Sequence, residues 1–196
     1  MKLRNAGWLF SAISLTGLVL VGCGTASSNG SVSAQIGGSN SVTVNENGQS
    51  TVIQGGLPYN GPQNLKKYEA AAAANPTNVQ AQIQAGVAAH VNQDDAKAII
   101  YYKKAIQLDP KNAVPYTNIG NIYLRDKGDA KAALPYYQKA TQVNPAYGYG
   151  WWNLAITEAK LGNKTVAQQA VATGLKKVPK TDPAYVGLQD EQKALQ

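Results

Sequence analysis

The chain has 196 residues, with 18 Lys or Arg and 11 Asp or Glu, for a formal net charge of +7 at pH 7, and this length allows one folded domain and a tail. The basic residues are scattered rather than gathered in a stripe, which argues against nucleic acid as a partner. With one histidine and one cysteine, neither a Ser–His pair nor a zinc cluster can be assembled, so we expect no enzyme activity, catalytic residue, metal, cofactor or small-molecule substrate.

Residues 1–22 are predicted to be an export signal. Lys2 and Arg4 give a basic start, and an apolar run from Ala6 to Val21 follows. The run is shorter than the roughly 20 residues that cross a bilayer. Loss of this segment leaves 16 basic and 11 acidic residues, a formal charge of about +5.

The signal ends in Leu20-Val21-Gly22-Cys23, which resembles the lipobox of bacterial lipoproteins. The resemblance implies lipidation of Cys23, cleavage before it, and an exported chain anchored to a bacterial membrane. That membrane would be the outer membrane in a Gram-negative cell, because Gly24 rather than aspartate follows, and otherwise the outer face of the plasma membrane. A single cysteine cannot form an internal disulfide, and several acyl chains anchor a protein stably. An ordinary signal with an incidental cysteine and an uncleaved anchor are the alternatives.

Residues 23–62 are predicted to be a flexible, disordered linker. They are rich in Gly, Ser, Asn, Thr and Gln, and a coil of this length spans roughly 35 Å. The alternative is a hairpin between Ser41–Val44 and Gln49–Ile53, although a lone hairpin is marginal in water.

The rest of the chain repeats at intervals set by four prolines, Pro76, Pro110, Pro145 and Pro179. Each unit between them carries small residues at matching positions, as in Gly86, Gly120 and Ala155, and larger ones such as Tyr102, Tyr137 and Val171. Small residues allow two helices to approach closely, and large ones fill the space that results. Turn residues such as Gly128-Asp129 divide each unit into two helices. We place a partial repeat helix at 63–78, full units at 79–112, 113–147 (with one residue inserted in its turn) and 148–181, and a capping helix at 182–196.

This period and these residues resemble the tetratricopeptide repeat family. Asn118-Ile119-Gly120, Tyr137-Gln138-Lys139-Ala140 and Asn144-Pro145 carry the resemblance, and Gln82 in the position of a large residue departs from it. The resemblance implies an all-α fold, a right-handed superhelical solenoid of helix–turn–helix repeats, preceded by the signal peptide and linker.

The resemblance also implies a groove on the concave side, formed by the first helix of each unit. The corresponding residues are Gln80, Ile83, Val87 and His90 in the first unit, Val114, Thr117, Asn121, Leu124 and Arg125 in the second, and Tyr149, Trp152, Ile156 and Lys160 in the third. We expect Trp152 either to anchor a ligand or to pack on the C-terminal helix. The lysine–asparagine clamp that some family members use for acidic tails is absent.

The sequence therefore predicts a membrane-anchored lipoprotein that binds a protein or peptide in a helical groove and serves as an adaptor or assembly scaffold at the bacterial cell envelope, in the manner of a pilotin. A cell-wall polymer binder, or an accessory subunit of envelope enzymes, is the alternative function. The partner, the pathway and the oligomeric state are not readable from the sequence.

Overall fold

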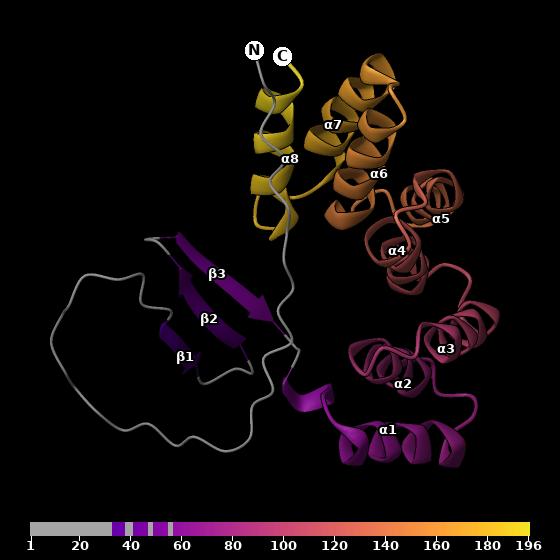
Figure 1. The fold of residues 1–196 in the computed structure, drawn as a ribbon. Helices are drawn as coiled ribbons and strands as arrows, with labels where there is room; N and C mark the ends of the chain where they lie inside the picture. The colour runs from indigo at the N-terminus through magenta and orange to yellow at the C-terminus, as the bar shows by residue number, and fades with distance from the viewer. Residues whose placement is uncertain (1–32, 38–40, 47–48, 55–56) are drawn as a thin grey trace, which may run out of the picture.

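The computed structural model describes residues 33–37, 41–46, 49–54 and 57–196. The predicted export signal and Cys23 lie outside these residues. The helical part begins with a single 3-10 turn, η1 (Leu57–Tyr59), and continues through α1 (Pro62–Ala74), α2 (Val79–Val91), α3 (Asp95–Leu108), α4 (Ala113–Asn121), the wide turn η2 (Ile122–Asp126), α5 (Ala130–Val143), α6 (Gly148–Lys160), α7 (Lys164–Lys177) and α8 (Ala184–Ala194). Each helix packs on the next along the chain, and the array follows a curved path with α2 and α4 on its inner side and α3 and α5 on its outer side (Figure 1).

An antiparallel sheet precedes the helices. Its strands are β1 (Ser33–Gly37), β2 (Ser41–Glu46) and β3 (Gln49–Gln54), in the order β1-β2-β3. The structure therefore differs from the fully flexible linker that we expected. It contains the alternative hairpin and adds a third strand. Val42 pairs with Ile53 and Thr43 with Val52, and such β-branched residues favour extended backbone.

The predicted helix–turn–helix units are α2 with α3, α4 and η2 with α5, and α6 with α7. The turn within each unit ends on a residue with a left-handed backbone, Gln93 (φ +65°), Gly128 (φ +66°) and Gly162 (φ +84°). The next residue caps the second helix: the side chains of Asp94 and Asp129 each accept a hydrogen bond from the backbone N–H three residues on. No strand occurs between Val79 and Pro179, all of which the structure describes.

The extra residue of the second unit is accommodated in the wide turn η2. In the third unit the backbone N–H of Asn163 donates to Glu158, five residues back, whereas in the second unit the N–H of Asp129 donates to Tyr123, six residues back. Ile122–Asp126 has π-helical geometry, and such wide turns arise from a single inserted residue. The insertion therefore lengthens the end of the first helix instead of the loop.

Close approach within a unit depends on the paired small and large residues. A Cβ atom added to Gly86 would lie 2.5 Å from the Tyr102 ring, and one added to Gly120 would lie 2.6 Å from the Tyr137 ring. Both rings are almost completely buried. These contacts fix the spacing of α2 against α3 and of α4 against α5.

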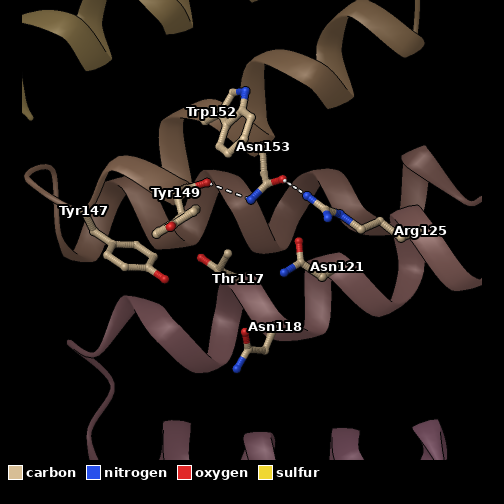
Figure 2. Close-up of a pocket in the computed structure, with 8 residues that line it drawn as sticks. All are labelled: Thr117, Asn118, Asn121, Arg125, Tyr147, Tyr149, Trp152 and Asn153. Atoms are coloured by element: carbon tan, nitrogen blue, oxygen red, sulfur yellow. Dashed lines mark hydrogen bonds between the residues drawn. The ribbon is translucent and has the colours of Figure 1, made fainter. Parts of the chain in front are cut away.

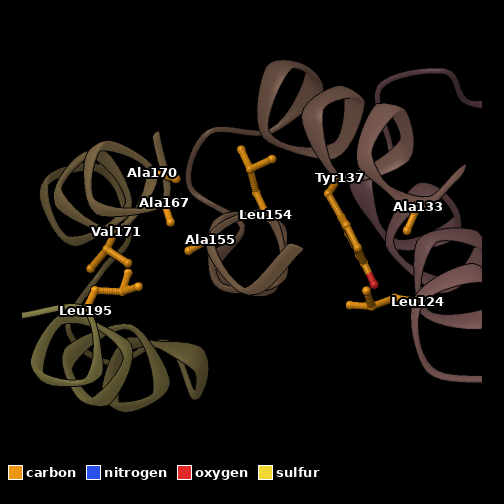
Figure 3. Close-up of a cluster of buried hydrophobic side chains, with 9 residues drawn as sticks. All are labelled: Leu124, Ala133, Tyr137, Leu154, Ala155, Ala167, Ala170, Val171 and Leu195. Atoms are coloured by element: carbon orange, nitrogen blue, oxygen red, sulfur yellow. The ribbon is translucent and has the colours of Figure 1, made fainter. Parts of the chain in front are cut away.

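The hydrophobic core extends from one unit to the next. The largest cluster contains side chains of η2, α5, α6, α7 and α8 (Figure 3), namely Leu124, Ala133, Tyr137, Leu154, Ala155, Ala167, Ala170, Val171 and Leu195. A second cluster joins α2, α3, α4 and η2. Because each cluster draws on two or more units, no single unit buries its apolar face alone.

A hydrogen bond to the proline that ends the preceding unit recurs in every unit. The fourth residue of each unit donates to that proline's carbonyl: Gln82 to Pro76 (3.4 Å), Tyr116 to Pro110 (3.3 Å) and Trp151 to Pro145 (2.8 Å). Gln82 also donates to the carbonyl of Ala72 at 3.0 Å, at the end of α1. The polar Gln82 thus replaces a large residue while keeping a link to the preceding proline.

The C-terminal helix α8 covers the last unit by packing on α6 and α7. Leu188 on this helix is completely buried and lies beside Gly174 of α7. Among the helices that the structure describes, none has both the length and the apolar content needed to span a membrane.

Candidate functional site

A cavity of about 330 Å³ lies on the inner side of the array between α4 and α6 (Figure 2). Its lining comes from α4, η2, α6 and the residue just before α6. The lining residues are Thr117, Asn118, Asn121, Arg125, Tyr147, Tyr149, Trp152 and Asn153. Two consecutive units therefore build the cavity together.

One side of the cavity is a chain of hydrogen bonds. The Arg125 guanidinium donates to the Asn153 side-chain oxygen at 3.2 Å, and the Asn153 amide donates to the Tyr149 carbonyl at 2.9 Å. Asn153 is buried, so its contacts hold the guanidinium in one position. Figure 2 shows this chain crossing from η2 to α6.

A buried core residue, Tyr137, fixes the side chain of Asn121. The Tyr137 hydroxyl donates to the Asn121 side-chain oxygen at 2.9 Å. This bond fixes the amide with its NH₂ group as the remaining donor, and no hydrogen bond between described residues engages that group. Asn121 can therefore donate to a carbonyl oxygen in the cavity.

Aromatic side chains form another part of the cavity lining. The ring centres of Tyr147 and Tyr149 lie 5.9 Å apart, and those of Tyr149 and Trp152 lie 6.2 Å apart. Burial raises the pKa of Tyr147 to about 12, with smaller contributions from Tyr149 and Asp182. Tyr147 therefore stays a neutral phenol at physiological pH and offers apolar surface with one hydroxyl.

The lining combines hydrogen-bond donors with aromatic surface. It contains no carboxylate, histidine or cysteine, and its one charged group is Arg125. Amide donors beside aromatic rings match a ligand that presents carbonyl oxygens next to apolar groups, such as an extended peptide.

Five of the predicted groove residues line this cavity, namely Thr117, Asn121, Arg125, Tyr149 and Trp152. The Trp152 ring also packs over α8, as the second expectation for it had it, since a Cβ atom on Gly187 would approach the ring within 2.7 Å. Its role as a ligand anchor stays a prediction.

The other predicted residues lie elsewhere. Ile83 and Leu124 are buried in the two core clusters, with exposures of 6% and 4%, so the groove assignment does not hold for them. Leu124 turns inward because the inserted residue changes the direction of the helix end. Val87, Val114 and Ile156 are partly buried and pack against the same clusters. Gln80 and Lys160 are exposed and do not line the cavity.

Three lining residues were not predicted: Asn118, Asn153 and Tyr147. Asn118 and Asn153 hold the same place in their units, and this recurrence was the available signal. Tyr147 precedes its helix by one residue, and groove positions counted from the helix start do not include it.

His90 lies at the end of α2, away from the cavity lining, with the carboxylates of Asp95 and Asp126 beside it. One atom of each of these three side chains lies within 4.8 Å of the others. Within the described part of the chain this is a group of side chains able to hold a metal ion.

Two family models match the helices. The tetratricopeptide repeat model TPR_19 matches residues 124–191, and the TPR repeat model TPR_11 matches residues 92–127. The helical part of this chain belongs to the tetratricopeptide repeat family. The predicted all-helical repeat fold is thereby confirmed.

The curated proteins to which the chain is similar are mostly much longer than the matched segment. The chain is 34% identical over 91 residues to the heat shock protein sti1 homolog of Schizosaccharomyces pombe, covering 46% of this chain but 15% of that protein. It is 31% identical over 91 residues to tetratricopeptide repeat protein 28 of Mus musculus, covering 46% of this chain and 4% of that one. For protein MJ0572 of Methanocaldococcus jannaschii the identity is 32% over 85 residues, which cover 43% of this chain and 80% of that one.

Solved tetratricopeptide repeat structures share the fold. The crystal structure of MamA has a TM-score of 0.53 at 23% identity and covers 67% of this chain and 82% of that chain. The Sgt2 TPR domain of Aspergillus fumigatus has a TM-score of 0.52 at 20% identity and covers 60% of this chain and 76% of that one.

Proposed function

We propose that this protein is a lipid-anchored adaptor at the bacterial cell envelope, which holds a segment of a partner protein in the cavity between α4 and α6. The observation that carries the proposal is the cavity itself, a volume of about 330 Å³ lined by both fixed amide and guanidinium donors and aromatic side chains. Repeats of this family bind protein or peptide partners in such grooves. The lipobox resemblance at Cys23 supports the membrane anchor.

An extended, largely apolar segment fits the cavity best. Its backbone carbonyls would accept from the Asn121 amide and from Arg125 at the cavity edge, because both donors are held in place by neighbouring side chains. Its apolar side chains would pack on Tyr149 and Trp152. Preorganised donors and aromatic anchors reduce the ordering cost of binding.

Partner capture from an envelope extract tests the proposal. Trp152→Ala removes an aromatic anchor, and Asn121→Asp keeps the acceptor for the Tyr137 hydroxyl while removing the NH₂ donor. We expect both variants to lose a protein that the wild type retains, whereas Val166→Ala on the exposed side of α7 retains it. Equal capture by all four proteins would contradict the proposed site.

A cell-wall polymer binder is the second candidate, and the row of Tyr147, Tyr149 and Trp152 favours it because aromatic faces beside amide groups also suit sugar rings. Retention on purified wall polymer, lost in Trp152→Ala and without a captured protein, would support this function in place of the adaptor.

A further inference from the structure

The side chains around His90 come from two different repeat units. His90 ends the first helix of one unit and Asp95 begins the second helix of the same unit, with 3.1 Å between His90 Nδ1 and Asp95 Oδ1. Asp126 ends η2 in the next unit, and its Oδ2 lies 3.9 Å from His90 Nε2. Each ring nitrogen of the imidazole therefore faces its own carboxylate.

The two carboxylates carry more negative charge than the imidazole between them can balance. A neutral imidazole has one N–H and can donate to one of the two carboxylates, and even an imidazolium leaves the group with one net negative charge. A cation with two positive charges would neutralise both carboxylates at once.

We propose that His90, Asp95 and Asp126 bind a divalent transition-metal ion of the Zn²⁺ type. An imidazole nitrogen with two carboxylate oxygens suits zinc and its neighbours, whereas Mg²⁺ and Ca²⁺ prefer oxygen ligands alone. Bonds of about 2.0–2.1 Å in tetrahedral geometry separate ligand atoms by about 3.4 Å. The three side chains already lie within 4.8 Å of one another, and the half-exposed Asp126 side chain can rotate to close the rest, with water as the fourth ligand.

The site is particular to the junction between the first and second units. At the positions of His90 and Asp95, the second unit has Leu124 and Ala130. The wide turn η2 is what brings Asp126 to the junction, since it lengthens the helix end by one residue. A bound ion would therefore tie α2 and α3 to η2, next to Arg125 at the edge of the cavity.

Titration with ZnCl₂ alone tests this inference on full-length, untagged protein carrying Cys23→Ser, which removes the one thiol. We expect one ion per chain by isothermal titration calorimetry and a rise in Tm with Zn²⁺ but not with Mg²⁺ or Ca²⁺. His90→Gln and Asp126→Asn should each weaken Zn²⁺ binding by at least the roughly 10- to 100-fold seen when only a supporting residue is lost.

Asp190→Asn, an exposed carboxylate on α8, is the matched control and should bind as the parent protein does. We expect each variant to fold, because the substituted side chains are partly exposed, and circular dichroism checks this. Absence of saturable Zn²⁺ binding in the parent, unchanged affinity in His90→Gln, or equal binding of Mg²⁺ would each overturn the proposal.

Discussion

At the scale of single residues, Gln93 is the one position where a side chain is forced into the left-handed backbone region in residues 57–196. The equivalent residues of the other two units are Gly128 and Gly162. Gln93 is also exposed, so its side chain gains little from packing.

We therefore expect Gln93→Gly to stabilise the protein. A left-handed backbone costs a residue with a Cβ about 1–2 kcal/mol, and the greater freedom of glycine in the unfolded chain offsets about half of this. The free energy of unfolding should rise by about 0.5–1 kcal/mol in urea denaturation. Lys103→Gly, at an exposed position inside α3, should instead lower it by about 1 kcal/mol. A loss of stability in Gln93→Gly would contradict this interpretation of the turn.

Glu191 gives a stability effect that depends on pH. Burial raises the pKa of this carboxyl in the folded protein, so the folded state binds the proton more tightly than the unfolded state. Its contribution to stability is therefore fully present at low pH and declines as pH rises through the raised pKa. Glu191→Gln should increase Tm at pH 7 and leave it unchanged near pH 4.

Because Glu191 is partly exposed, water screens the effect, and we expect a change of only a few tenths of a kcal/mol. Asp190→Asn on the exposed side of α8 removes the same charge without burial and serves as the control. An equal gain for Glu191→Gln at both pH values would show that the charge is not the cause.

Site residues could be predicted from the sequence where the position in the repeat determines which way the side chain points. Thr117, Asn121 and Trp152 follow from counting along a regular helix. Leu124 does not, because the inserted residue changes the helix end just before it. Neither does Asn153, which is buried and contributes to the cavity through the hydrogen bonds that it makes.

At the scale of helices, the paired glycine and tyrosine positions set how closely two helices pack. A Cβ atom on Gly120 would lie 2.6 Å from the Tyr137 ring, far inside contact distance. Gly120→Ala should therefore destabilise the protein by about 1–3 kcal/mol through overpacking, despite the better helix propensity of alanine. Thermal and urea unfolding measure this change.

A second substitution separates the clash from other causes. Tyr137→Leu alone leaves a cavity and should also destabilise. In the double variant the smaller side chain makes room for the added methyl, so the combined loss should be smaller than the sum of the two. Simple additivity would contradict the predicted contact.

The sequence predicted the helices and their small and large contacts because these recur three times at a fixed interval. It placed the extra residue of the second unit in the turn, whereas the structure accommodates it in the wide turn η2 at the helix end. A loop and a wide helical turn differ by hydrogen bonds that composition does not reveal. For the segment that holds the sheet, a flexible linker was the prediction and a two-stranded hairpin only the alternative. The first strand, Ser33–Gly37, was missed because it has few strand-forming residues.

At the scale of the whole molecule, the proposed anchor at Cys23 would decide where the array works. Cys23→Ala should abolish metabolic labelling by palmitate in a bacterial host and release the protein from the membrane fraction. The substitution leaves the helices unchanged, so the circular dichroism of the purified variant should match that of the parent. If labelling persists in Cys23→Ala, the lipid is not attached at Cys23 and the proposed anchor is wrong.

The wide turn η2 has a consequence for how such a protein can change over evolutionary time. One added residue would rotate the continuation of an ordinary helix by about 100°. Here Asp129 still stands directly before α5, as Asp94 and Asn163 stand before the corresponding helices. The wide turn η2 thus absorbs a change in chain length locally. A lineage can gain or lose a residue there while the downstream repeats stay in phase.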